Sequence, residues 1–493
     1  MESRIIRYGV TAFTALLLAL GGSASSQAQQ PAHDPGVRGG DAGAGDPFPG
    51  LSDPLKNLFE AGRDAFAEPE KVDEGLGPRM NLDSCLGCHA TPAAGGSSPV
   101  PNPQFSFLKG LGSKTTNTLP SFITEQGPTR EARFKLFRYA TTGPDGGVHD
   151  LFTIAGMEGA ESCKIEQPDF EKELRLNNVI FRIPTPVFGA GLIEQIPDTA
   201  IRDNINADQD QKKVMGIRSK LNFVIAGNTI TGLPNKNGND GTIARFGWKA
   251  QNKSLLVFSG EAYNVEMGIT NELFQTEREE DPNCQFHTTP NDTTDPSQIT
   301  ETDPVKRLDI LSDIEKFASF MRLLAPPVPS SDTPGGSGSI AKGRALFNEV
   351  GCALCHTPML KTSIESTIPQ LRDKEAHLYS DLAVHQMGPN LADGVSQGQA
   401  KEDEFRTAPL WGLGKRIFFL HDGRTDDLVK AIEEHRSLST VSFRCRLLSF
   451  FGLSRLCGPD DGTMASEANA VVEQYNKRPD TEKQDLLNFL RSL

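Results

Sequence analysis

The chain has 493 residues, of which 37% are hydrophobic and 23% charged, and its formal net charge is −14 at pH 7. This size and balance predict two or three globular domains with cores of their own and exclude a disordered or fibrous protein. The negative charge argues against nucleic acid or an anionic membrane surface as a partner. It suits a basic electron-transfer partner, or simply a well-solvated surface.

The N-terminus has the pattern of an export signal. Arg4 and Arg7 precede the apolar run at 10–20, and Ser26-Gln27-Ala28 provides small residues at a cleavage position. We therefore predict that residues 1–28 are a signal peptide. The apolar run is shorter than the roughly 18 residues that indicate a membrane span, and no later stretch reaches that length. The protein is expected to have no membrane span after cleavage.

Two helical segments precede a linker. Residues 29–50 are rich in Gly, Pro and Asp, which predicts a disordered lead-in. Apolar residues at helical spacing then predict helices over 55–66 and 305–324. A stretch rich in Pro, Gly and Ser predicts a linker over 327–340. The domain boundary is placed at this linker, which gives an N-terminal domain of 51–326 and a C-terminal domain of 341–493.

The pattern Cys-x-x-Cys-His occurs twice in the chain, at 85–89 and at 352–356. At this spacing two thiols attach covalently to one haem while the adjacent histidine binds its iron. The alternative is a pair of redox or zinc dithiols that are followed by histidine by chance. Covalent haem attachment takes place outside the bacterial inner membrane, which agrees with the export signal and predicts a periplasmic protein. We predict two covalent c-type haems, held by Cys85, Cys88, His89, Cys352, Cys355 and His356.

Four further cysteines are predicted to form disulfides, because the expected compartment is oxidising. Cys445 and Cys457 bracket a short apolar segment and would form a local clip. Cys163 with Cys284 would then close a long loop in the N-terminal domain. The two other pairings stay open.

Each domain is expected to surround one motif with helices. In the C-terminal domain, helices are predicted over 341–350 and 481–493, an arrangement that resembles the small cytochrome c fold. The N-terminal domain resembles a larger version, with a β-hairpin predicted from the runs 223–233 and 242–248. The predicted fold is mainly α, with two cytochrome c-like domains that each hold one covalent haem and with small β-hairpin insertions in the larger N-terminal domain.

An internal repeat supports a duplication. The segments 186–191 and 409–414 both read Pro, apolar, aromatic, Gly, x, Gly, and each follows a Cys-x-x-Cys-His motif. Coincidence in a loop-rich sequence is the alternative. The second copy leads into His421-Asp422-Gly423-Arg424 and the first has no matching histidine, so the two haems need not have the same role. Residues expected near haem propionates or at the contact between the domains, unless they only form loop hydrogen bonds, are Arg182, Arg406, His421, Asp422 and Arg424.

Several stretches resemble the bacterial di-haem cytochrome c peroxidase superfamily, and more closely its di-haem oxidoreductase branch, sometimes labelled thiol oxidoreductase-like. They are 75–79, 182–198, 245–251, 266–270 and 405–435. The resemblance implies that the C-terminal haem receives electrons from a small donor of the cytochrome c or cupredoxin type, and that the N-terminal haem meets the oxidant. The superfamily often holds calcium between its domains, but no spacing of oxygen ligands here establishes that site. Thiol oxidation has no support beyond the label.

The resemblance also bears on the sixth ligand of the C-terminal haem. Leu428, Ile432 and His435 share one face of a predicted helix, so His435 should point inward. The peroxidases carry methionine at this position. His435 therefore suggests bis-histidine ligation with His356 and a lower reduction potential. A core histidine bonded to a backbone carbonyl is the alternative reading, and Met387 is the competing ligand.

The distal side of the N-terminal haem is expected to carry the chemistry. His149 is a possible sixth ligand; otherwise the position is open or holds water. Trp248 and Glu266 match a tryptophan and a distal glutamate of the peroxidases, with Phe258 where a glutamine is expected. Such a carboxylate can take a proton from peroxide and return it to the departing oxygen, and the tryptophan can relay electrons. The alternatives are ordinary core packing for Trp248 and a surface or helix-capping acid for Glu266.

Together these features predict a periplasmic di-haem c-type oxidoreductase that reduces a small oxidant, in the first place hydrogen peroxide. Glu266 and Trp248 are its expected catalytic residues. A non-catalytic di-haem electron carrier is the main alternative, and a di-haem oxidase or oxygenase of an organic substrate is a third possibility, because one scaffold serves several chemistries in this superfamily.

Overall fold

A computed structural model describes most of the chain after residue 30. The described residues are 31–112, 115–135, 157–160, 162–163, 166–236, 241–279, 281–287, 289–295, 297, 303, 306–438, 440–441, 462–463 and 465–493. The predicted signal peptide, His149 and the predicted Cys445 to Cys457 clip lie outside these residues. Among the described residues, no helix is long and apolar enough to cross a membrane.

The described part of the chain is mainly helical, as predicted. The helices before the linker are α1 (Asp53–Ala67), α2 (Cys85–Cys88), α3 (Pro103–Leu111), α4 (Phe170–Arg175), α5 (Ala190–Glu194), α6 (Asp198–Asn206), α7 (Gln209–Met215), α8 (Leu255–Glu266) and α9 (Asp313–Leu323). Those after it are α10 (Gly336–Val350), α11 (Leu428–Glu434), α13 (Asn469–Asn476) and α14 (Asp480–Ser492). Short 3-10 turns lie at Val72–Glu74, Pro282–Cys284, Lys306–Ile310, Cys352–Leu354 and Leu413–Lys415.

Strands form only small two-stranded antiparallel sheets in the described residues. The pairs are β1 (Glu131–Phe134) with β2 (Val179–Arg182), β3 (Ile225–Ala226) with β4 (Thr229–Ile230), β5 (Leu360–Lys361) with β6 (Glu375–Ala376), β7 (Val384–Gln386) with β8 (Glu404–Arg406), and β9 (Thr440–Val441) with β10 (Gly462–Thr463).

The predicted hairpin differs in detail. The run 223–233 folds back on itself as β3 and β4, and it meets the run 242–248 only at a bridge between Phe223 and Ile243. The reason is the turn Gly227-Asn228, where both residues adopt positive φ.

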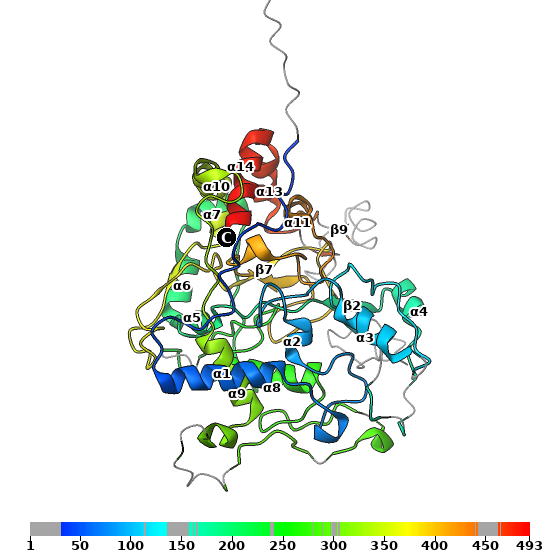
Figure 1. Cartoon of the computed structure of the whole chain (residues 1–493). Helices are drawn as coiled ribbons and strands as arrows, with labels where there is room; N and C mark the ends of the chain where they lie inside the picture. Colours follow the sequence, from blue (N-terminus) through cyan, green and yellow to red (C-terminus); the bar gives the residue numbers. More distant parts are fainter. Residues whose placement is uncertain are drawn as a thin grey trace, which may run out of the picture.

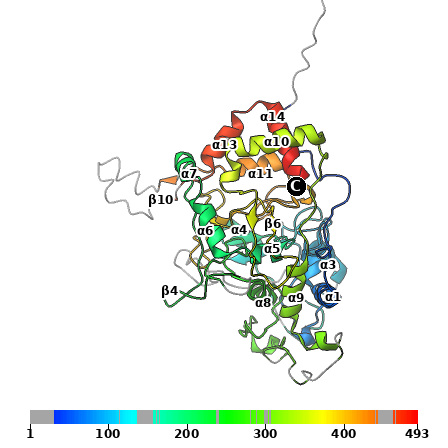
Figure 2. The same cartoon turned by 90° about the vertical axis from the view of Figure 1, so that its left-hand side faces the viewer.

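Two pairs of helices pack closely in separate parts of the molecule (Figures 1 and 2). The helices α1 and α9, with α8 beside them, lie in the lower half of both views, and α10 and α14 lie at the top. Each crossing is close because one helix carries glycine. A side chain at Gly62 of α1 would collide with the backbone of α9 and with Phe320, and a side chain at Gly343 of α10 would collide with the backbone of α14 and with Phe489. The two halves therefore use the same crossing.

The Pro, apolar, aromatic, Gly, x, Gly repeat occupies matching places in the two halves. Gly191 packs directly on the backbone of Arg322 in α9, and Gly414 packs on the backbone of Arg491 in α14. The sequence of α1 at 62–66 and that of α10 at 343–347 also share the pattern Gly-Arg-x-x-Phe. These matched contacts support the predicted duplication.

Two short stretches differ from the expectation of disorder. Residues 31–50 are not a disordered lead-in: Phe48 N donates to Leu323 O at 3.0 Å and Arg38 N donates to Gly414 O at 2.8 Å. The composition is typical of disorder, but the partners lie hundreds of residues away in the sequence. Similarly, α10 begins at Gly336, so the end of the predicted linker is helical.

Candidate functional site

The two motif histidines are held in the same way. His89 Nδ1 lies 2.9 Å from Gly96 O, and His356 Nδ1 lies 3.0 Å from Tyr379 O. A carbonyl oxygen only accepts, so each Nδ1 carries the proton and each Nε2 keeps a free lone pair. A backbone carbonyl on Nδ1 is the usual arrangement for a histidine that binds metal through Nε2.

The thiols of both motifs are free and partly buried. Burial raises the pKa of Cys85, of Cys88 and of Cys352, so these three groups are neutral at pH 7. Ser84 caps the turn of the first motif, where its side chain accepts from Gly87 N. Both motifs thus present a thiol pair and a histidine from a short helical turn.

A large apolar cavity opens in front of the second motif. It contains about 1420 Å³ of space free of protein atoms, its open mouth included. His356, Cys352 and Cys355 line one part, and α11 contributes Leu428, Ala431 and Ile432 with the adjoining His435. Met387 lines the same cavity. The cavity therefore brings His356 together with both candidate sixth ligands.

His435 has the geometry of a ligand on this cavity. Its Nδ1 lies 2.7 Å from Ala431 O, which again leaves Nε2 free. Burial lowers the pKa of His435, and burial followed by the nearby charge of His435 lowers the pKa of His356 to about 4. Both imidazoles are therefore neutral at pH 7, the form that binds a metal.

Two arginines beside the cavity, the buried Arg406 and the half-buried Arg416, lack an acidic partner among the described residues. Burial lowers the pKa of Arg416 to about 10, and burial together with Arg416 does the same for Arg406. Arg416 Nε is buried without a hydrogen-bond partner. Buried cations require an anion close by. A haem has carboxylates of this kind, so the apolar lining, the thiols, the free Nε2 atoms and these arginines fit a haem.

The expected partner Arg182 is already engaged, because it forms an ion pair with the buried Asp393. The sequence prediction that Arg182 pairs with a propionate therefore loses support. Arg416, which the sequence did not single out, lines the cavity instead. Its signal was weak: an arginine in an apolar run, Arg416-Ile-Phe-Phe-Leu420.

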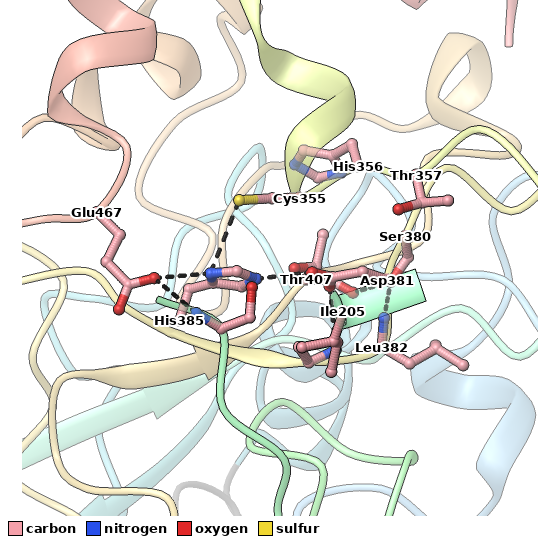
Figure 3. Close-up of polar contacts among 12 residues, drawn as sticks. Ile205, Cys355, His356, Thr357, Ser380, Asp381, Leu382, His385, Thr407 and Glu467 are labelled. Atoms are coloured by element: carbon pink, nitrogen blue, oxygen red, sulfur yellow. Dashed lines mark hydrogen bonds and ion pairs between the residues drawn. The ribbon is translucent and has the colours of Figure 1, made fainter. Parts of the chain in front are cut away.

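A buried histidine network adjoins the second motif (Figure 3). His385 Nε2 lies 2.9 Å from Asp381 Oδ2, and His385 Nδ1 lies 2.9 Å from Glu467 Oε2 and 3.7 Å from Cys355 Sγ. Carboxylates accept on both sides, so both ring nitrogens carry protons. Burial acts to lower the pKa of His385, but Cys355 and Asp381 raise it well above its usual value. A charged imidazole thus lies beside the second attachment cysteine.

Trp248 lies on the wall of the second cavity, between the halves. Its Nε1 donates to Ile183 O at 3.0 Å, and its side chain is 8% exposed. It packs in a cluster with Ile183 from the first half and with Met387 and Phe405 from the second. The ring of His421 lies 6.5 Å from that of Trp248 and stacks on Phe405.

The loop at 421–424 joins the two halves. Ile183 N donates to His421 O at 2.9 Å, and Arg130 Nε donates to Asp422 O at 3.0 Å. Arg424 Nε donates to Asp422 Oδ2 at 2.8 Å. These bonds agree with the expected contact between the halves.

Glu266 lies near the first motif, at the end of α8. Its charge acts on both His89 and Cys88. Surrounding protein raises the pKa of Glu266, although Arg133 and His89 oppose this effect. The residue is nevertheless exposed to solvent, as the alternative of a surface acid expects. An exposed carboxyl group with a raised pKa thus lies close enough to the first histidine for its charge to act on that histidine.

The remaining predicted features concern the disulfide, Phe258 and metal-binding clusters. Cys163 and Cys284 form the predicted disulfide. Phe258 stacks on Phe246 at 6.0 Å. Within the described range no cluster of three or more His, Cys, Asp or Glu is arranged to hold a metal ion.

Two mainly helical halves, each with a thiol pair and a histidine, define a duplicated protein with two haem-type motifs. A family model described as "Di-haem oxidoreductase, putative peroxidase" matches residues 97–446, which is more than half of the chain. The chain therefore belongs to the di-haem oxidoreductase family. The match includes the second motif, Trp248, Glu266 and His435, whereas the first motif precedes it. A search of curated proteins found no match.

Proposed function

We propose that this protein is a periplasmic di-haem c-type oxidoreductase that reduces hydrogen peroxide. Family membership supports the class of oxidoreductase and two haems. The single observation that carries the finer proposal is the inequality of the two sites. His435 shares a cavity with His356, whereas the charge of the acid Glu266 acts on His89.

In this proposal, Cys85, Cys88 and His89 hold one haem, and Cys352, Cys355 and His356 hold the other. The haem iron supplies one-electron chemistry and, where a coordination position is open, a place for an oxidant. His356 and His435 line one cavity and would together hold the haem iron at the second site. This site serves as the entry point for electrons from a small cytochrome c or cupredoxin.

Glu266 handles protons at the first site. Because the protein around this exposed side chain raises its pKa, Glu266 would accept a proton from peroxide more readily than an ordinary carboxylate and could return it to the departing oxygen. Trp248 lies between the halves and provides a path for electrons. Its hydrogen bond to Ile183 O fixes the position of the indole ring between the two halves.

The test is rapid mixing of the half-reduced protein with hydrogen peroxide. Glu266→Gln should slow the reaction by about 10²- to 10⁴-fold, the usual contribution of a general acid and base. Glu261→Gln is the matched control, because it removes the same charge from the same helix. A wild-type protein inert to peroxide would contradict the proposal and favour an electron carrier.

A further inference from the structure

A segment near the N-terminus, residues 33–41, crosses the surface of the second half; we call it the strap. His33 N donates to Gln484 Oε1 of α14 at 3.0 Å. Lys415 Nζ donates to Arg38 O at 2.9 Å and to Gly40 O at 2.6 Å. Figure 1 shows the strap in dark blue, beside α14. Hydrogen bonds thus hold the strap at several points, and its partners lie hundreds of residues away in the sequence.

Asp34 is the central contact of the strap. Its Oδ1 accepts from Arg491 Nε at 2.7 Å, and its Oδ2 accepts from Arg491 Nη2 at 2.5 Å. The Arg491 side chain is 1% exposed, so this two-bond ion pair is largely shielded from water. Asp34 Oδ2 also accepts from the backbone N of Leu428 at 2.8 Å. One carboxylate therefore connects α14 to the first residue of α11.

Arg491 extends this connection to the cavity wall. Its Nη1 donates to Arg416 O at 2.8 Å, and its guanidinium lies 4.8 Å from the centre of the Phe419 ring. Arg416 and Phe419 both line the second cavity. The ion pair of Asp34 and Arg491 thus contacts the backbone of Arg416, the arginine without an acidic partner among the described residues.

The helix that Asp34 holds is short. It has 7 residues, fewer than the roughly 12 to 15 that a helix needs to persist alone. Its placement must therefore come from packing and from contacts at its ends. Asp34 binds the first residue, Leu428, and His435 follows the last turn. A shift at the first turn moves His435 with the helix.

We propose that the strap, through Asp34, positions α11 and thereby aims His435 into the second cavity. Asp34 is a positioning residue, because it acts through α11 and lines no part of the cavity itself. The ligand role of His435 rests on the proposed function. The placement of α11 by Asp34 does not depend on the proposed function, because it follows from the hydrogen bond to Leu428 N.

The test compares Asp34→Asn with Asp41→Asn in the full-length, haem-loaded protein. Both variants remove one negative charge from the strap, but Asp41 is exposed and, among the residues that the structure describes, its carboxylate accepts a hydrogen bond only from Gly43 N. Hydrogen exchange of the amides of 428–435 should accelerate about tenfold in Asp34→Asn and stay unchanged in Asp41→Asn. Equal exchange in both variants would overturn the proposal.

A second readout separates positioning from general stability. Cyanide should bind the second haem at least about tenfold faster in Asp34→Asn, because His435 leaves its position more often. A lower melting temperature with unchanged exchange and unchanged cyanide binding would show a merely structural role and contradict the proposal. Should Asp34→Asn fail to fold, Asp34→Glu keeps the charge for Arg491. The exchange of α11 should then lie above the wild-type rate, and a wild-type rate would overturn the inference.

The experiment distinguishes failure of His435 as a haem ligand from failure of the strap proposal. If the wild-type spectrum shows no bis-histidine haem, the role assigned to His435 fails while hydrogen exchange still tests the strap. If the wild type shows that haem and α11 exchanges normally in Asp34→Asn, only the strap inference fails.

Discussion

Arg416 is a single residue that requires an anionic partner, and the described part of the chain does not supply one. Its side chain is half-buried, its buried Nε has no hydrogen-bond partner, and it has no carboxylate partner among the described residues. In the chain without haem, Arg416→Gln should leave the free energy of unfolding unchanged or raise it by about 1 kcal/mol, because an unpaired buried charge is removed. In the loaded protein the same change should lower it by about 1 to 3 kcal/mol. Urea unfolding of both forms checks this, and a change of the same sign in both forms would contradict the assignment.

Glu70 provides a pH test at the first half. Burial raises the pKa of Glu70 from 4.5 to about 7, the bond from Tyr263 opposes this, and Asp313 adds to it. A carboxyl with a raised pKa contributes stability that is complete below pH 4.5 and is lost as the pH rises through about 7. Because Glu70 is only partly buried, we expect a loss of about 1 to 2 kcal/mol.

The reference for this test is Glu70→Gln, which does not titrate. The stability advantage of the wild type over this variant should fall between about pH 5 and about pH 8 in urea unfolding. A stability advantage of the wild type that grows over this pH range would contradict the raised pKa of Glu70.

The residues that could be predicted are those whose spacing is fixed by local chemistry. The Cys-x-x-Cys-His motifs follow from the geometry of attachment, and the inward direction of His435 follows from helical periodicity. Arg416 and His385 could not be found in this way, since their surroundings come from segments far apart in sequence. His385, for example, contacts Glu467, which is 82 positions away.

Among the elements, the two helix crossings should be sensitive to a single methyl group. Gly343→Ala places that group against the backbone of α14 and against Phe489, whereas Gly338 on the same helix has no atom within 4 Å of the added position. Gly343→Ala should therefore lower the free energy of unfolding by about 1 to 3 kcal/mol. Gly338→Ala should raise it by up to about 1 kcal/mol, because alanine favours helix. Denaturant unfolding measures both, and an equal effect would refute the close packing.

The helices at 53–67, 313–323 and 480–492 could be predicted because each buries one periodic apolar face. The strap could not. Its Gly and Pro content is typical of disorder, and its order depends on Arg491 and Gly414, which only the folded chain brings near. The short β3 and β4 hairpin is a different case, because the local turn Gly227-Asn228 decides it and not a partner far away in sequence.

At the scale of the whole molecule, duplication explains the matched crossings and the matched histidine bonds, and divergence explains the two unequal sites. One half carries α11 with His435, and Asp34 of the strap accepts a hydrogen bond from the first residue of this helix. The other half places Glu266 near its histidine. The inequality of the sites is the central claim, since it assigns electron entry to one site and peroxide to the other.

Electron paramagnetic resonance of the oxidised and half-reduced protein tests this claim most directly. We expect a low-spin bis-histidine signal from the second haem that disappears when one electron is added, and a remaining ferric signal at the first haem that changes on addition of peroxide. Two low-spin signals that are both unchanged by peroxide would contradict the inequality of the two sites.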